Sequence, residues 1–237
     1  MKRLRPFFNF YGSKWILAPR YNAPQQDRVI ECCAGSASYG VLHAAKEVLL
    51  VDIDPVICSV WDYLIGVSES EMLGLPLHFD HVDELSLPPE AKAFLGFWLG
   101  KANPRPCKSL SKWGRQQRDT GEFLGFWCER IRLRVATQLQ HIRHWRVLNA
   151  SYADIPEQQA TYFVDPPYGK MGYCYRFNKI DFAHLGEWCK NRAAAGSQVI
   201  ACEAEGADWL PFEVLHSTRG NRLRRYREMV CNLPQTI

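Results

Sequence analysis

Four consecutive residues, Asp165-Pro166-Pro167-Tyr168, carry the groups needed to hold a planar amine. The Asp165 carboxylate can accept a hydrogen bond from an amino group, and the prolines hold the neighbouring backbone carbonyls as rigid acceptors. Tyr168 offers a flat face for stacking. The apolar run 161–164 before them is β-branched and aromatic, which predicts a buried strand. These residues predict a site for the exocyclic amine of a nucleobase, although the motif alone also fits a strand-ending turn with a solvated Asp.

A second group of residues is typical of nucleotide-binding sites. A strand predicted over 28–31 is followed by Gly35, which lets the backbone approach a ligand closely. The next predicted strand, 47–51, ends at Asp52, about twenty residues after the glycine turn, where a carboxylate can bind two ribose hydroxyls. Asp54 stands just before a proline and is predicted to cap the following helix.

The segment 12–14 (G-S-K) is a third candidate. It follows an aromatic stretch that includes Phe10 and Tyr11, and it precedes a stretch that looks helical up to Pro19. A turn before a helix can bind an anion, or the carboxylate of a ligand that carries a sulfonium, through backbone N–H groups and the Lys14 ammonium. The phosphate-binding pattern G-x-x-x-x-G-K-[ST] is absent from the sequence.

The order of the predicted elements indicates an α/β fold with a doubly wound, Rossmann-like sheet that finishes in an antiparallel hairpin. Further strands are expected at 145–148, 161–164 and 198–202, and the hairpin at 211–215 and 226–231. We expect a ligand to lie across the carboxyl ends of the strands. The catalytic core is predicted to comprise 1–80 and 144–237, and a helical insert to comprise 81–143.

The insert is strongly basic. Residues 101–146 contain eleven Lys and Arg against three acids, although the net charge of the whole chain is only +4. The polar, turn-rich segment 103–118 is predicted to be a mobile binding loop, and 122–143 a long helix with bases on one flank. A second basic cluster near the C-terminus consists of Arg219, Arg222, Arg224, Arg225 and Arg227. Such clusters indicate a polyanionic partner, the alternative being two solvated faces.

The composition indicates a globular protein from a reducing compartment. Of 237 residues, 47% are hydrophobic and 23% charged, which is ordinary for such proteins. No apolar stretch of about 18 residues and no apolar signal core is present. The nine cysteines are odd in number and form no C-x-x-C pair, which argues against a disulfide framework and a structural zinc. We therefore expect a cytoplasmic protein with no membrane association, no metal and no obligate protein partner.

These segments together resemble the Dam-like DNA adenine-N6 methyltransferases, specifically the small phage and prophage members. Segment 31–36 (E-C-C-A-G-S) is similar to the family's E-P-F-A-G-S-G motif, and 7–14 resembles its N-terminal F-x-x-W-x-G-G-K segment. Segment 165–168 resembles the D-P-P-Y motif. Their order is that of the alpha arrangement. Segment 149–154 (N-A-S-Y-A-D) resembles the one that supplies an aromatic contact to the adenine of the cofactor.

Three departures from the family pattern bear on cofactor affinity. Cys32-Cys33 stands where the family has Pro-Phe, Ser13 replaces a glycine, and Phe10 replaces a tryptophan. None of them removes a chemical group that methyl transfer requires.

The resemblance implies an adenine-specific DNA methyltransferase that uses S-adenosylmethionine and flips the target base out of the duplex. Its catalytic residues would be Asp165, Pro166, Pro167 and Tyr168. Its cofactor-binding residues would be Phe10, Tyr11, Gly12, Lys14, Glu31, Ala34, Gly35, Ser36, Asp52, Ile53, Tyr152 and Asp165. Among these, Lys14 would hold the methionine end of the cofactor, Asp52 the ribose and Tyr152 the adenine.

The implied partner is DNA, expected to be double-stranded. The insert would contact it through Lys112, Arg115, Arg118 and Arg130. The chain has no room for a nuclease domain, so the restriction activity of a restriction–modification pair would belong to another protein. Three alternatives stay open. The same motif can serve methylation of cytosine N4 or of adenine in RNA, and the fold could also belong to a non-catalytic nucleic-acid-binding protein.

Overall fold

The computed structural model describes residues 3–233, except for 102, 120–124, 170–171 and 220–224. Two arginines of the C-terminal basic cluster, Arg222 and Arg224, therefore lie outside the described residues, as do the side chains of Arg219 and Arg225.

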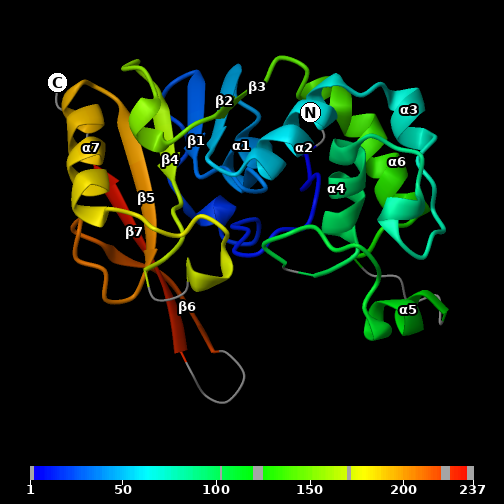
Figure 1. Ribbon diagram of the computed structural model, residues 1–237. Helices are drawn as coiled ribbons and strands as arrows, with labels where there is room; N and C mark the ends of the chain where they lie inside the picture. Colours follow the sequence, from blue (N-terminus) through cyan, green and yellow to red (C-terminus); the bar gives the residue numbers. More distant parts are fainter. Residues whose placement is uncertain (1–2, 102, 120–124, 170–171, 220–224, 234–237) are drawn as a thin grey trace.

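Within the described residues, seven strands form one sheet in the order β3-β2-β1-β4-β5-β7-β6 (Figure 1). The strands are β1 (Arg28–Cys32), β2 (Glu47–Asp52), β3 (Arg146–Asn149), β4 (Thr161–Val164), β5 (Gln198–Ala204), β6 (Glu213–Arg219) and β7 (Arg225–Leu233). The first five strands are parallel, whereas β7 runs antiparallel to both β5 and β6. The predicted doubly wound α/β sheet with an antiparallel C-terminal pair is confirmed.

The centre of the sheet is buried on both faces. All four residues of β4 are buried, and successive side chains belong to different hydrophobic clusters. Tyr162 and Val164 pack on the side of α7, whereas Phe163 packs on the other side against Tyr21 and Tyr39. A central parallel strand is covered by helices on both sides, which is why this segment is apolar without alternation.

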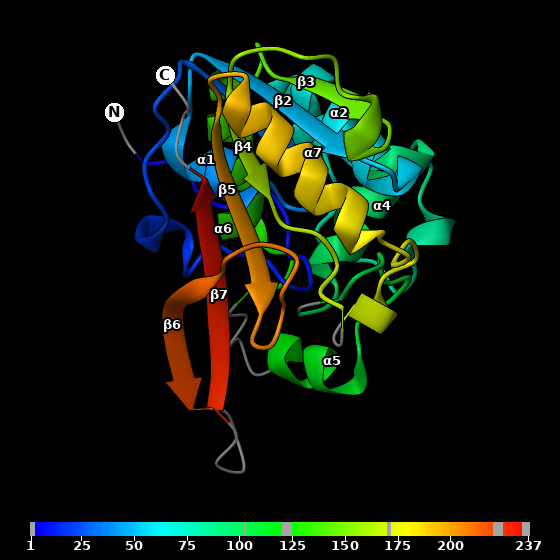
Figure 2. The same cartoon turned by 90° about the vertical axis from the view of Figure 1, so that its left-hand side faces the viewer.

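The α-helices of the described chain are α1 (Ser38–His43), α2 (Pro55–Gly66), α3 (Glu69–Leu73), α4 (Pro89–Trp98), α5 (Lys112–Asp119), α6 (Glu129–Gln138) and α7 (Phe182–Ala194). Short 3-10 helices occupy Ala18–Arg20, Val82–Glu84, Leu139–His141, Tyr152–Asp154 and Gly172–Cys174. Helix α7 lies across one face of the sheet (Figure 2), and α1 and α2 cover the other. None of the helices in the described part of the chain is long and apolar enough to cross a membrane.

The start of α2 confirms the role predicted for Asp54. Its side-chain Oδ1 accepts a hydrogen bond from the backbone N–H of Val56 (3.0 Å), and Pro55 occupies the first helical position. This arrangement satisfies one of the free N–H groups of the first turn. It also leaves Asp52, two residues earlier, available for the site described below.

The helices of the predicted insert pack directly on the sheet domain. Helix α4 contacts α2, and α6 contacts α3. One hydrophobic cluster includes Trp61 of α2, Phe97 of α4, Val135 of α6 and Phe8 of the N-terminal segment. The boundaries predicted for the insert stay a prediction, but its helices share a core with the first part of the chain.

Three local predictions were wrong. The segment 103–118, predicted to be a loop, contains the start of α5, whose N-terminus is capped by the Ser111 hydroxyl accepting from the N–H of Gly114 (3.0 Å). Residues 122–124 of the long helix predicted at 122–143 lie outside the described residues. In the described part only α6 and a 3-10 turn after it are helical, because Gly125 has φ +90° and Cys128, directly before α6, is extended. The stretch after Lys14 forms turns and a 3-10 helix instead of an α-helix.

Candidate functional site

The carboxyl ends of β1, β2 and β4 meet at one edge of the sheet. Strand β1 lies between the other two, and Cys32 pairs with Val51 on one side and Val164 on the other. The backbone N–H of Ala34 donates to the carbonyl of Val51 (3.0 Å), and that of Asp165 donates to the carbonyl of Cys32 (3.4 Å). The turns that follow the three strands are therefore adjacent, as expected for a ligand site of this fold.

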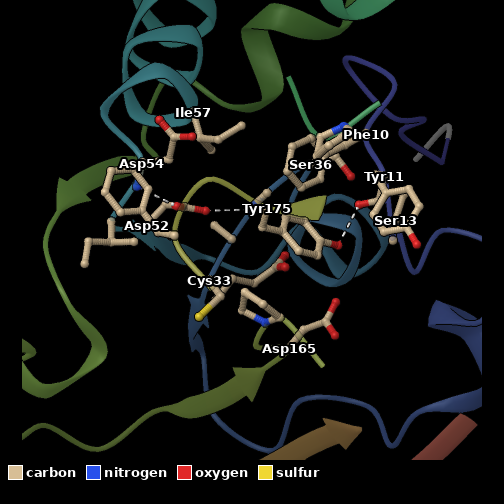
Figure 3. A pocket seen from close by; sticks show the side chains of 18 of the residues that line it. Phe10, Tyr11, Ser13, Cys33, Ser36, Asp52, Asp54, Ile57, Asp165 and Tyr175 are labelled. Carbon is tan, nitrogen blue, oxygen red and sulfur yellow. Dashed lines mark hydrogen bonds between the residues drawn. The ribbon is translucent and has the colours of Figure 1, made fainter. Parts of the chain in front are cut away.

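A hollow of about 730 Å³, open solvent included, lies at this edge (Figure 3). Of the twelve residues predicted to bind the cofactor, eleven line it: Phe10, Tyr11, Gly12, Lys14, Glu31, Ala34, Gly35, Ser36, Asp52, Ile53 and Asp165. We call it the first hollow.

Tyr152 is the predicted cofactor residue that does not line the first hollow. Its hydroxyl makes a hydrogen bond with Nδ1 of His184 (2.8 Å), and its ring packs edge-on against Trp188. The side chain is thus held against α7.

Asp52 holds the glycine turn in place. Its Oδ2 accepts from the backbone N–H of Gly35 (2.9 Å), and its Oδ1 accepts from that of Asp54 (2.9 Å). Burial raises the pKa of the Asp52 carboxyl to about 6, and these backbone hydrogen bonds oppose the shift. A carboxylate has about four lone-pair positions, so the Asp52 side chain can still accept a hydrogen bond from a ligand.

Gly35 needs to be a glycine for two reasons. Its φ is +48°, and a Cβ would lie 2.8 Å from the ring of Phe10. Its carbonyl accepts from Nε1 of Trp61 (2.8 Å), a side chain that is fully buried beneath the turn. The hydrogen bond from the buried Trp61 indole therefore fixes the glycine turn of the first hollow to the hydrophobic core.

Glu31 is a buried carboxyl beneath the same turn. It is 3% exposed, and its Oε1 accepts a hydrogen bond from the backbone N–H of Gly40 at the start of α1. Burial raises the pKa of Glu31 to about 8, from an ordinary value of 4.5. Between pH 4.5 and about 8, the folded protein therefore keeps a proton on Glu31 that the unfolded chain has released.

We expect Glu31→Gln to stabilise the protein at alkaline pH. Because the pKa is raised on folding, the stability that protonated Glu31 provides is complete below pH 4.5 and is lost as the pH rises through about 8. Glutamine keeps the acceptor for Gly40 and cannot ionise. Urea unfolding between pH 5 and 9 measures the free energy of unfolding. The difference between variant and wild type should grow in favour of the variant by at most about 1.4 kcal/mol per pH unit. Glu157→Gln, at an exposed position, is the control, and a constant difference across this range would contradict the assignment.

A second, larger hollow shares a wall with the first. The residues common to both are Phe10, Tyr11, Gly12, Ser13, Lys14, Asp165 and Tyr175. The second hollow is lined in addition by Pro166 and Tyr168, and by His216, Thr218 and Glu228 from the C-terminal hairpin. Pro167 faces the first hollow instead. Asp165 therefore lies where the two hollows meet.

Lys14 is paired with Asp165 rather than free in the first hollow. Its Nζ lies 2.7 Å from Oδ1 of Asp165 and donates to the carbonyl of Gly12 (3.2 Å). The residue is 7% exposed. Burial alone would lower the pKa of Lys14, but the carboxylates of Asp165 and Glu228 raise it above its ordinary value. The lysine is therefore charged, and it occupies the carboxylate that was predicted to accept the amine of a base.

The Tyr168 ring has a cation over it and an acid at its hydroxyl. The Lys14 ammonium lies 4.5 Å from the ring centroid, a distance at which a cation is attracted to an aromatic face. The Tyr168 hydroxyl donates to Oε1 of Glu228. Analysis of the sequence did not identify Glu228, because a single acid in a basic terminal strand carries no local signal.

Tyr175, in the loop after the D-P-P-Y motif, is a further residue of the site. Its hydroxyl donates to the carbonyl of Tyr11 (3.1 Å), as Figure 3 shows, and it lines both hollows. A Cβ on Gly12, whose φ is +73°, would lie 2.3 Å from that hydroxyl. The aromatic richness of this loop was the available signal.

The four basic residues predicted to contact nucleic acid lie in or near α5 and α6. Lys112 begins α5 and is exposed, and Arg115 donates from Nη1 to the carbonyl of Leu110 (2.5 Å). Arg130 is exposed on α6, and the side chain of Arg118 lies outside the described residues. Of the three described side chains, none lines either hollow, but Lys101, which lies over the half-exposed ring of Trp113 in α5, lines the second.

No protein-family model and no curated protein matches the sequence. Among solved structures, the chain is similar to a protein described as "Putative methyltransferase yhhF from Escherichia coli", with 11% identity, a TM-score of 0.34, and coverage of 91% of this chain and 79% of that one. It is also similar to a protein described as "putative methylase HI0767 from Haemophilus influenzae", with 13% identity, a TM-score of 0.32, and coverage of 91% and 83%. A function for this chain is therefore argued from its own site.

Proposed function

We propose that the protein transfers a methyl group from S-adenosylmethionine to the exocyclic N6 of adenine in DNA. The observation that supports this most directly is the position of Asp165, in the wall between a hollow lined by the glycine turn and Asp52 and a hollow lined by Tyr168. A transferase of this kind needs a cofactor site and a base site that meet at the reacting amine.

The residues of the first hollow suit this cofactor. The free acceptor positions of Asp52 can take ribose hydroxyls, and Gly35 presents bare backbone. Asp52 and Asp54 line the hollow, and carboxylates favour a cationic ligand over a neutral one. When bound, the cofactor supplies an electrophilic methyl group on a sulfonium.

The second hollow suits a base that has left the duplex. Removing a base from the stack costs a few kcal/mol, and stacking and hydrogen bonding in the enzyme offset this cost. Tyr168 offers the stacking face, and Asp165 and the carbonyl of Pro166 offer acceptors for the two hydrogens of the amine. Both the ring and the carboxylate are held by partners, so their geometry is set before the base arrives.

The nitrogen of an aromatic amine is a weak nucleophile because its lone pair is delocalised into the ring. Hydrogen bonds from both of its hydrogens to fixed acceptors draw the nitrogen toward tetrahedral geometry and localise the lone pair. Asp165 and Pro166 would do this work, and the rest of the site would hold the amine in line with the methyl group. No nucleophilic cysteine is required. Cys33 lines the first hollow, and burial raises its pKa, which keeps it a thiol.

We propose duplex DNA as the partner, bound through the basic residues of the insert. Its affinity should fall steeply with salt, because each neutralised phosphate contributes about −0.9 to the slope of log K against log [salt]. Lys112→Gln should make that slope shallower by about 1. Lys190→Gln in α7, whose Nζ pairs with Glu187, is the matched control. An affinity that is insensitive to salt would contradict this mode of binding.

The function is tested by incubating the protein with labelled S-adenosylmethionine and either duplex DNA or RNA, followed by mass spectrometry of the nucleosides. N6-methyladenine in DNA is the expected product. N4-methylcytosine, or methylated adenine confined to RNA, would replace the proposed substrate with another. Cofactor binding without transfer to any nucleic acid would refute the enzymatic proposal.

A further inference from the structure

The buried cation of the site has two carboxylates beside it. Nζ of Lys14 lies 2.7 Å from Asp165 and 3.8 Å from Oε1 of Glu228. The side chains of the three residues are 8%, 21% and 14% exposed, respectively. Ion pairs that are this well shielded from water are costly to break on one side only, because the remaining charge stays buried without a partner.

The acid is brought to the site by the C-terminal hairpin. Glu228 lies on β7, where it pairs with Ala204 of β5 and His216 of β6. Its Oε1 accepts from the hydroxyls of Tyr21 (2.8 Å) and Tyr168. Two phenol donors and a nearby ammonium all favour an ionised carboxylate, although burial raises the pKa of Glu228. The same oxygen therefore binds the hydroxyl of Tyr168 and lies near the Lys14 ammonium.

The charges explain what the second carboxylate would achieve. As the structure stands, Lys14 is nearest to Asp165, the carboxylate that the proposed reaction needs for the amine. With Glu228 present, the ammonium has another anion within 3.8 Å and can release Asp165 without becoming an unpaired buried charge. With a neutral residue at 228, Asp165 would be the only carboxylate close to Lys14. The lysine would then compete with the amine of the base for Asp165.

We propose that Glu228 is a positioning residue of the site, which holds the Tyr168 ring by its hydroxyl and takes Lys14 from Asp165 when the amine of the substrate binds. This inference rests on the proposed function. It assigns to the last strand of the sheet a part in freeing the acceptor, and it predicts that the charge of residue 228, and not only its hydrogen bonds, matters for turnover.

Glu228→Gln tests the charge by itself, because the amide oxygen can still accept from both tyrosines. We expect kcat/KM for DNA to fall by about 10- to 100-fold, the size of effect caused by a misplaced reacting group. The Kd of the cofactor should stay within about twofold of the wild type, since the first hollow is not lined by Glu228. Glu187→Gln, at an exposed acid that pairs with Lys190 in α7, is the matched control and should behave as the wild type.

A purely structural role predicts the opposite pattern. If Glu228 only holds the two tyrosine hydroxyls, then Glu228→Gln retains normal turnover and Glu228→Ala alone is impaired. That result would overturn the proposal while leaving the methyltransferase function intact.

Thermal unfolding of each variant shows whether it is folded. If Glu228→Gln does not fold, Tyr168→Phe replaces it, with a loss of about tenfold in kcat/KM expected and wild-type turnover counting against the proposal. Failure of the wild type to methylate any nucleic acid overturns the proposed function and, with it, this inference.

Discussion

Replacement of Asp165 by alanine is expected to reduce kcat by about 10²- to 10³-fold, the usual effect of removing one fixed group that stabilises the transition state. The carboxylate lies between the two hollows and offers the only charged acceptor that we assign to the amine. Lys14 would keep Glu228 as a partner at 3.8 Å, so the variant does not leave the ammonium without an anion. Single-turnover methyl transfer with saturating cofactor measures the effect.

The same variant should bind the cofactor almost normally, because Gly35 and Asp52 are held by each other and not by Asp165. Isothermal titration with the cofactor separates loss of binding from loss of chemistry. Asp208→Ala, at an exposed position after β5, serves as the control. Turnover retained by Asp165→Ala would refute the catalytic assignment, whatever the result for binding.

Replacement of Trp61 by alanine should cost about 3–5 kcal/mol of unfolding free energy, as expected for removing a large buried aromatic side chain. Trp61 is fully buried and packs against Phe7, Phe8 and Trp145. Its Nε1 also donates to the carbonyl of Gly35. The loss is measured by urea unfolding with the slope m checked for constancy.

Trp113→Ala is the matched control, since that indole is 49% exposed in α5 and should change stability far less. Trp61→Phe retains most of the packing and removes the donor to Gly35. We expect Trp61→Phe to raise the Kd of the cofactor although the variant stays folded, because the Gly35 carbonyl loses its hydrogen bond from Trp61. Equal destabilisation by Trp61→Ala and Trp113→Ala would show that the core around α2 tolerates the cavity.

The central strands and the acid at the start of α2 were predictable because their determinants are local. A run of four β-branched and aromatic residues, with two prolines shortly after it, favours a short buried strand over a helix, and β4 has these bounds. Asp54 caps α2 because a short acid before a proline suits a helix start. The common edge reached by Gly35, Asp52 and Asp165 followed from the parallel order of the strands.

The insert was predicted less well because its local signals conflict. Prolines and Gly114 indicated a loop throughout 103–118, but the Ser111 cap starts α5 within it. The apolar residues Ile131, Val135 and Leu139 suggested one helix over 122–143, but Gly125 is left-handed and Cys128 is extended before α6 begins. In both places the residues directly before the helix decided where it begins, and they outweighed the average tendency of the segment.

The sequence by itself determined the α/β class, the strand that carries the D-P-P-Y motif and the glycine turn after β1, because each depends on residues close together in the chain. Only the tertiary structure decided which charges meet. Lys14, Asp165 and Glu228 are separated by more than sixty residues at each step, and they come together through the order of strands in the sheet. Such pairing depends on distances in the folded chain, which no local pattern of residue types encodes.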